Sequence, residues 1–199
     1  MPLEQDILVK YSLKNSVIYD IGANAGYYAI IAAREVGESG HVYAFEPTPS
    51  MANRIHENAE KNAFNNVTVI EAAVSSIDGK INFGIAEDSI SSSIRGADSE
   101  NSLLVTSLRL DTFVRSNRPP NLLLVDIEGA ELDALESGLE LITQYRPVIM
   151  VEVHWLGQSF TDFITKHILP LGYKVTTYDG KALPDEVTRY HALLVPEPR

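Results

Sequence analysis

The sequence contains no cysteine, and this absence excludes disulfide bridges, thiolate nucleophiles and cysteine-ligated zinc or iron–sulfur centres. Long apolar runs are also missing, because no stretch approaches the ~18 residues that a membrane span needs. The N-terminal stretch carries Glu4 and Asp6 and has no continuous apolar segment, so we do not expect a signal peptide. Together these absences predict a cytoplasmic protein.

Basic residues are scarce in this chain. The sequence has 16 Lys and Arg against 27 Asp and Glu, which gives a formal net charge of −11. Proteins that bind duplex nucleic acid use Lys and Arg to displace the counterions of the phosphates, so the composition argues against a nucleic-acid partner. With 199 residues and 45% hydrophobic residues, we expect one domain over 1–199, with 1–15 as a short N-terminal helical extension.

Strand-like and helix-like segments alternate along the chain. Thr48 is the expected N-cap of the second helix, with Pro49 at its first position. The section 78–110 is richer in Ser and Gly and predicts strands joined by a polar loop that contains Ser89–Ser93. Strands are expected at 16–20, 41–45, 67–73, 121–126, 147–153, 173–177 and 191–195, and helices at 25–36, 49–62, 129–141 with a break near 137–138, and 159–168. This alternation favours an α/β fold with a mostly parallel sheet and helices on both faces.

The stretch VIYDIGANAGYYAI (17–30) contains a glycine turn between the first strand and the first long helix. Asp20 ends the strand, and Gly22 and Gly26 let the chain turn sharply and let a ligand approach the backbone. A dinucleotide fingerprint needs G-x-G-x-x-G, and a P-loop needs a Lys after its second glycine. The turn has neither feature, so both phosphate-binding interpretations are disfavoured.

Glu46 ends the second predicted strand, 20 residues after Gly26. A carboxylate at this place accepts hydrogen bonds from the ribose hydroxyls of an adenosine. An adenosine ligand without a pyrophosphate fits both features, and S-adenosylmethionine is such a ligand, with its amino-acid end on the glycine turn. The alternative is that Asp20 caps a helix and Glu46 is simply exposed before Pro47.

Five blocks of this sequence resemble the FkbM-type methyltransferases in the same order. They are DIGANAGYYAI, FEPTP, LRLDTF, LLLVDIEGAELDALESG and PVIMVEVHW, and they span most of the chain, from 17 to 155. The resemblance implies a class I, S-adenosylmethionine-dependent enzyme with a Rossmann-like fold, in most members an O-methyltransferase. It also implies a seven-stranded sheet with one antiparallel edge strand, which 191–195 would supply.

The residues expected to bind the cofactor follow the strands that form this site. The turn would seat the methionine end, Tyr27 or Tyr28 would cover the cofactor, and the end of the third strand would recognise adenine through backbone and small side chains. The full set is Asp20, Gly22, Ala23, Asn24, Gly26, Tyr27, Glu46, Pro47, Ala72, Ala73 and Asp126.

The block DIEGAE supplies the first candidate catalytic groups. Asp126 and Glu128 are two residues apart, so they point the same way if the strand continues. Such a pair can bind a divalent metal, orient an acceptor hydroxyl, or let one carboxylate raise the pKa of the other. The alternative is that Glu128 and Glu131 are first-turn acids favoured by a helix dipole. A bound metal is not favoured, because no third ligand is evident in the sequence.

The block VEVHW supplies the second candidate group. Glu152 and His154 share a face at the end of a buried strand, and histidine is the side chain best suited to proton transfer near neutral pH. His154 is therefore the candidate base, with a structural role as the alternative. Trp155 either lines the acceptor pocket or belongs to the core. For Asp111, in the block LRLDTF, we expect a structural role in which its carboxylate binds backbone groups.

These patterns predict an O-methyltransferase acting on a small molecule or a sugar-containing metabolite. An N-methyltransferase acting on an amine or a protein side chain is the first alternative. A NAD-type oxidoreductase is the second, and it is opposed by the missing middle glycine. A catalytically silent binding protein is the third, and the intact DIEGAE and VEVHW blocks argue against it. The oligomeric state stays open, with a homodimer as one option.

Overall fold

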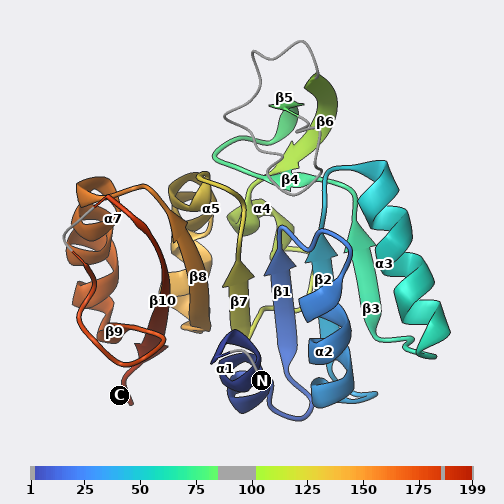
Figure 1. The fold of residues 1–199 in the computed structure, drawn as a ribbon, viewed down its shortest axis with the longest axis horizontal. Helices are drawn as coiled ribbons and strands as arrows, with labels where there is room; N and C mark the ends of the chain where they lie inside the picture. The colour runs from blue at the N-terminus through green and yellow to red at the C-terminus, as the bar shows by residue number, and fades with distance from the viewer. Residues whose placement is uncertain (1–2, 85–101, 185–186, 199) are drawn as a thin grey trace.

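The centre of the protein is a seven-stranded sheet, in the computed structural model that describes residues 3–84, 102–184 and 187–198 (Figure 1). Every neighbouring pair within it is parallel except the two pairs made by the last strand of the chain. The strand order is β3 (Val67–Ile70), β2 (His41–Phe45), β1 (Val17–Ile21), β7 (Leu122–Val125), β8 (Val148–His154), β10 (Arg189–Pro196) and β9 (Tyr173–Thr177). The expected Rossmann-like α/β fold is therefore confirmed.

The antiparallel strand β10 is not at the edge of the sheet, so the expectation of an antiparallel edge strand is wrong. It lies between β8 and β9 and is antiparallel to both, with Ala192 opposite Val151 on one side and Thr177 on the other. Ala192 and Leu194 are fully buried. An inner position pairs the backbone groups of β10 on both sides, whereas an edge position would leave one row unpaired.

Side chains at alternate positions of the strands point to opposite faces of the sheet and form two separate hydrophobic cores. Helices cover both faces. Strand β7 is accordingly buried at all four positions, as its continuous apolar run predicts. On one face lie α1 (Leu3–Tyr11), α2 (Tyr27–Val36) and α3 (Pro49–Lys61); on the other lie α4 (Leu110–Phe113), α5 (Glu131–Ser137), α6 (Leu139–Tyr145) and α7 (Gln158–Phe163), which continues into a π-helical turn (Ile164–Ile168) and a 3-10 turn (Leu169–Leu171). None of the helices in the described part of the chain has the length and apolar character needed to cross a membrane.

A second, three-stranded sheet stands at the carboxyl ends of β1, β2 and β7 (Figure 1). It contains β4 (Ala73–Val74), β6 (Ser102–Leu108) and β5 (Gly79–Gly84) in that order. The third predicted strand, 67–73, therefore ends earlier than expected, since the chain leaves the large sheet after Ile70. The strands expected within 78–110 are present, while Ser89–Ser93 lies outside the described residues.

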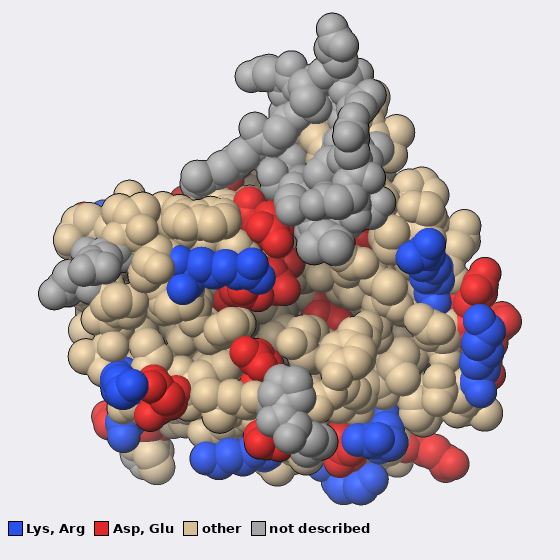
Figure 2. Space-filling view, viewed as in Figure 1, with Lys and Arg blue, Asp and Glu red and all other residues tan. Residues whose placement is uncertain are grey.

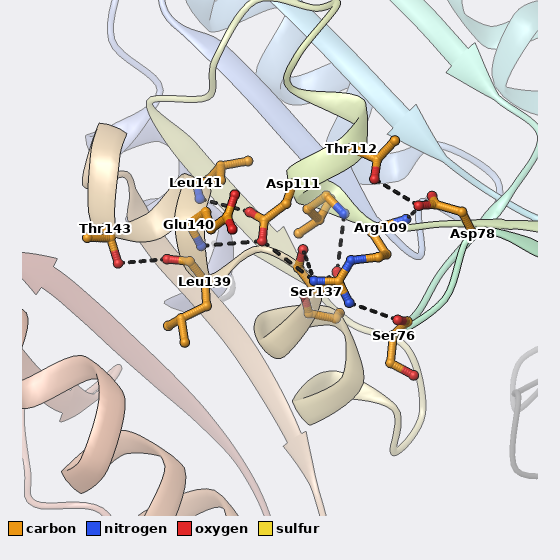
Figure 3. Close-up of polar contacts among 12 residues, drawn as sticks. Ser76, Asp78, Arg109, Asp111, Thr112, Ser137, Leu139, Glu140, Leu141 and Thr143 are labelled. Carbon is orange, nitrogen blue, oxygen red and sulfur yellow. Dashed lines mark hydrogen bonds and ion pairs between the residues drawn. The ribbon is translucent and has the colours of Figure 1, made fainter.

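Asp111 holds the beginning of α6 (Figure 3). Its buried carboxylate accepts hydrogen bonds from the backbone N–H of Leu141 at 2.8 Å and of Glu140 at 3.3 Å, and Arg109 lies 3.6 Å away as an ion-pair partner. The first N–H groups of a helix have no partner within the helix, so a carboxylate placed there stabilises them. The structural role expected for Asp111 is therefore confirmed.

Replacing Asp111 with alanine should lower the free energy of unfolding by about 2–3 kcal/mol, because the change leaves buried N–H groups at the start of α6 without an acceptor. Chemical denaturation measures this difference. The matched control is Glu136→Ala at an exposed position of α5, which should change stability by less than ~0.5 kcal/mol. Equal stability of Asp111→Ala and the wild-type chain would contradict the anchoring role.

Candidate active site

A cavity of about 390 Å³ opens at the carboxyl ends of β1, β2 and β7, below the small sheet. In a parallel α/β sheet this is the edge at which ligands bind. Figure 2 shows acidic side chains gathered near the middle of this face of the molecule. The described residues that line the cavity are Gly22, Asn24, Phe45–Met51, Ala72–Val74, Phe83, Leu103, Asp126–Glu128 and Arg189.

The glycine turn forms one wall of the cavity through Gly22 and Asn24. Gly22 has a positive φ of 88°, and a Cβ added to it would lie 1.9 Å from the backbone oxygen of Asp126. Its N–H and that of Ala23 both donate to the carbonyl of Phe45 at 3.0 Å. Only glycine allows this close approach, so the turn holds the ends of β1, β2 and β7 together.

Glu46 lines the cavity directly after β2, and it is buried rather than exposed. Its Oε2 accepts a hydrogen bond from the N–H of Asn24 at 3.0 Å, and its Oε1 accepts one from the N–H of Thr48 at 2.8 Å and one from the Thr48 hydroxyl. A carboxylate has about four lone-pair positions, so one acceptor position remains on Oε2. Thr48 precedes α3 as predicted, but its hydroxyl contacts Glu46 instead of capping the helix.

Two carboxyls near the turn, those of the buried Asp20 and the partly buried Asp126, have raised pKa values. Burial, with a smaller contribution from the charge of Asp126, raises the pKa of Asp20 to about 7, and Asp20 Oδ2 has no hydrogen-bond partner among the described residues. Burial, followed by the charge of Glu152, raises the pKa of Asp126 itself to about 7. Acids with strongly shifted pKa values in a cleft are typical of functional sites.

His154 lies at the centre of the acidic groups, on the face that it shares with Glu152 as their alternation predicts. Its Nδ1 is 2.6 Å from Oε1 of Glu131, and both side chains are fully buried. Its Nε2 is 3.5 Å from Glu128, 3.8 Å from Glu152 and 3.9 Å from Asp126. Burial lowers the pKa of His154. The hydrogen bond to Glu131 and the charges of Glu131, Glu128 and Asp126 have a larger opposite effect, so the pKa of His154 lies above its ordinary value.

Asp126 and Glu128 both reach the cavity, although not because the strand continues. Strand β7 ends at Val125, and Glu128 has a left-handed backbone with φ of 51° before Gly129. Glu131 lies in the first turn of α5, which is the position that the alternative interpretation predicted for it. Its carboxylate nevertheless points inward, where it accepts the N–H of Gly129 at 2.9 Å and contacts His154.

Arg189, at the start of β10, is a cavity residue that the sequence interpretation missed. Its Nε donates to Glu152 Oε1, and Nε2 of His191 lies 3.5 Å from Glu152 Oε2. Burial opposes ionisation of Glu152, but these contacts overcome it and lower the pKa of Glu152 to about 2. Arg189 reaches the site because the antiparallel register of β10 and β8 places it opposite His154. Local sequence patterns do not contain this register.

Several expected site residues are not among the described residues that line the cavity. Ala23 is buried beside the turn, and Gly26 packs against Ile55 of α3, where an added Cβ would lie 3.1 Å from it. Tyr27 is 57% exposed and its hydroxyl contacts Gln5. Trp155 is 59% exposed, so its alternative as a core residue is wrong.

Comparison with known families gives a match over most of the chain. The family described as Methyltransferase FkbM domain matches residues 20–175. The hexuronic acid methyltransferase AglP of Haloferax volcanii is 30% identical over 156 residues, which cover 76% of this chain and 62% of that protein. The chain therefore spans less than two thirds of the length of this relative.

Solved structures with the same fold are methyltransferases of low sequence identity. The crystal structure of Methyltransferase FkbM from Methylobacillus flagellatus has a TM-score of 0.63 and 14% identity, and the match covers 90% of this chain and 43% of that one. A SAM-dependent O-methyltransferase from Thermotoga maritima has a TM-score of 0.59 and 13% identity, with 100% and 66% of the two chains covered. At these identities the likeness shows the fold alone.

Proposed function

Because the chain belongs to the FkbM methyltransferase family, we propose that it transfers a methyl group from S-adenosylmethionine to a hydroxyl of a sugar-containing metabolite. The observation that carries the proposal is the shared cavity. It is lined by the glycine turn, by Glu46 and by the carboxylates Asp126 and Glu128, which come from three different strand ends. A cofactor and an acceptor bound there would lie side by side, which is what a direct transfer requires.

The cavity residues fit S-adenosylmethionine in charge and shape. Gly22 exposes backbone at the turn, and Asp20 behind it has a carboxyl oxygen with no hydrogen-bond partner in the described part of the chain, which favours a nearby ammonium group. The remaining acceptor position of Glu46 suits a ribose hydroxyl, beside Pro47. The small, buried side chains of Ala72 and Ala73 leave room for a flat adenine under the small sheet.

In the proposed reaction, an acceptor oxygen attacks the methyl carbon of the sulfonium. The O–C bond forms as the C–S bond breaks, the products are the methyl ether and S-adenosylhomocysteine, and the hydroxyl proton must go to a base. His154 Nε2 is fully buried behind the wall, whereas Glu128 lines the cavity 3.5 Å from it. We therefore assign the proton transfer to Glu128 and not to His154.

The acceptor class follows from the relative and from one cavity residue. The relative from Haloferax volcanii carries hexuronic acid in its name, and a uronic acid has a carboxylate beside its hydroxyls. Arg189 reaches the cavity, and a guanidinium carries five N–H donors, of which Nε–H is used by Glu152. The remaining donors suit an acceptor carboxylate, so we propose an acidic sugar as the substrate class.

Calorimetry with S-adenosylmethionine and with NAD tests the proposed cofactor. We expect binding of S-adenosylmethionine and S-adenosylhomocysteine and no binding of NAD, because the turn lacks the middle glycine of the dinucleotide pattern. An assay of S-adenosylhomocysteine release with uronic acid-containing and neutral oligosaccharides and with amines then tests the acceptor. Binding of NAD alone would refute the proposal, and transfer to amines alone would refute O-methylation.

Replacing Glu46 with glutamine should weaken S-adenosylmethionine binding about 10-fold or more, since a hydrogen bond to a charged group contributes ~1.5–3 kcal/mol. Calorimetric titration measures the dissociation constant. Glutamine keeps an oxygen for Thr48 but places its NH2 group at the position of Oε2, which faces Asn24, so thermal unfolding is measured to check that the variant is folded. The control is Glu60→Gln at an exposed position of α3. Wild-type affinity in the Glu46 variant would remove this side chain from the cofactor site.

Replacing Glu128 with glutamine should lower turnover by about 10²–10⁴-fold, because the amide keeps the shape of the side chain but cannot take the acceptor proton. Affinity for S-adenosylmethionine, measured separately, should stay within about 2-fold, since this carboxylate is assigned to the acceptor side. Glu136→Gln on the exposed surface of α5 is the control. A variant with wild-type turnover would exclude Glu128 as the base.

A further inference from the structure

Three potential metal ligands meet at one wall of the cavity, which Asp126 lines. They are Asp126, which directly follows β7, and Glu152 and His154, at the end of β8. One donor atom of each residue lies within 4.8 Å of the other two. Glu152 and His154 come from the end of β8, and Asp126 comes from the end of the neighbouring strand β7. The pairing of these two strands therefore brings together three ligands, although the sequence alone did not show a third one.

The orientation of His154 gives the second, independent observation. Glu131 accepts a hydrogen bond from Nδ1, and its oxygen is in turn held by the N–H of Gly129. The proton on Nδ1 leaves the lone pair on Nε2, which points toward the carboxylates. Nε2 is fully buried and has no hydrogen-bond partner among the described residues. Metal-binding histidines are typically held in this way by a carboxylate on the other nitrogen.

The distances leave room for a cation between these groups. A protonated Nε2 would draw one carboxylate to about 2.8 Å, yet the nearest oxygens stand at 3.5 to 3.9 Å. Octahedral coordination with bonds of ~2.1 Å places adjacent donors ~3 Å apart and opposite donors ~4.2 Å apart. From 3.9 and 3.8 Å, the oxygens of Asp126 and Glu152 therefore need to move about 1 Å closer to Nε2 to reach adjacent positions, which carboxylate rotation allows.

Other charged groups face the same carboxylates. Arg189 contacts Glu152 from the cavity side, and His191 lies near the other oxygen of Glu152. Neither residue lies within ion-pair distance of Asp126, whereas His154 Nε2 lies 3.5 to 3.9 Å from Asp126, Glu128 and Glu152. The space in front of Nε2 is therefore lined by three carboxyl groups, and Glu152 is the one that Arg189 contacts.

We propose that Asp126, Glu152 and His154 bind a divalent first-row metal ion such as Mn²⁺, which holds the acceptor hydroxyl in the cavity. The mixture of one imidazole and two carboxylates suits Mn²⁺ or Zn²⁺ and leaves open positions for substrate oxygens. This inference rests on the proposed function and deepens it. A metal-bound hydroxyl loses its proton more readily, and the proton goes to Glu128 as assigned above. The favoured acceptor presents two adjacent oxygens, as a sugar diol or a hydroxy acid does.

The experiment titrates Mn²⁺ into the metal-stripped full chain without cofactor, followed by calorimetry and electron paramagnetic resonance. We expect one Mn²⁺ for each chain, displaced by Zn²⁺. Asp126→Asn and Glu152→Gln should weaken binding by more than the ~10–100-fold that outer-shell changes produce, and Glu131→Gln should weaken it by about that amount. Glu136→Gln is the control, and thermal unfolding checks that each variant is folded.

Absence of Mn²⁺ and Zn²⁺ binding up to millimolar concentration would overturn the inference. Equal affinity of the folded Asp126→Asn variant and the wild-type chain would overturn it as well. Binding of S-adenosylmethionine to the metal-free chain is measured in parallel. If the chain binds S-adenosylmethionine but no metal, the metal site fails and the proposed function stands. If it binds Mn²⁺ through these residues but neither S-adenosylmethionine nor S-adenosylhomocysteine, the proposed function fails instead.

Discussion

The parallel pairing of β1 with β7 joins two segments that are far apart in the chain, and the cavity depends on it. At the start of the pair, the N–H of Val17 donates to the side-chain oxygen of Asn121 at 2.8 Å, and the N–H of Asn121 donates to the carbonyl of Val17 at 2.8 Å. At the other end, Gly22 lies against the carbonyl of Asp126. Because the two strands end at the same edge, the turn that would seat the cofactor faces the carboxylates that would act on the acceptor.

The same pairing buries acidic groups near one another, and burial opposes their ionisation. Asp20 and Asp126 have raised pKa values, while Glu152, contacted by His191 and Arg189, has a lowered one. Similar side chains therefore differ in charge state because of their surroundings, which is how a fold separates acid and base roles. The proposed sulfonium and the proposed metal ion would both bring positive charge into this acidic region, so the two proposals share one electrostatic cause.

Local patterns were sufficient for the elements of the large sheet and for the turn, because both depend on residues close together in the chain. The glycines of the turn, the carboxylate after β2 and the alternation of Glu152 with His154 could all be located in this way. The position of β10 between β8 and β9 could not be predicted in this way, since it depends on which strands pair with it. Arg189 was missed for that reason. The inward direction of Glu131 was missed because a first-turn acid looks the same whether it faces solvent or a buried imidazole.

The sequence alone determined the fold class and the order of the chemical groups, since both follow from the periodicity of apolar residues and from the motifs at strand ends. It also determined the resemblance to the FkbM-type methyltransferases, which the match over residues 20–175 bears out. Only the tertiary structure decided that Asp126, Glu152 and His154 meet, that Glu131 orients the imidazole and that Arg189 lines the cavity. The physical reason is that these contacts join separate strands through sheet register, and register is a property of packing between segments rather than of any one segment.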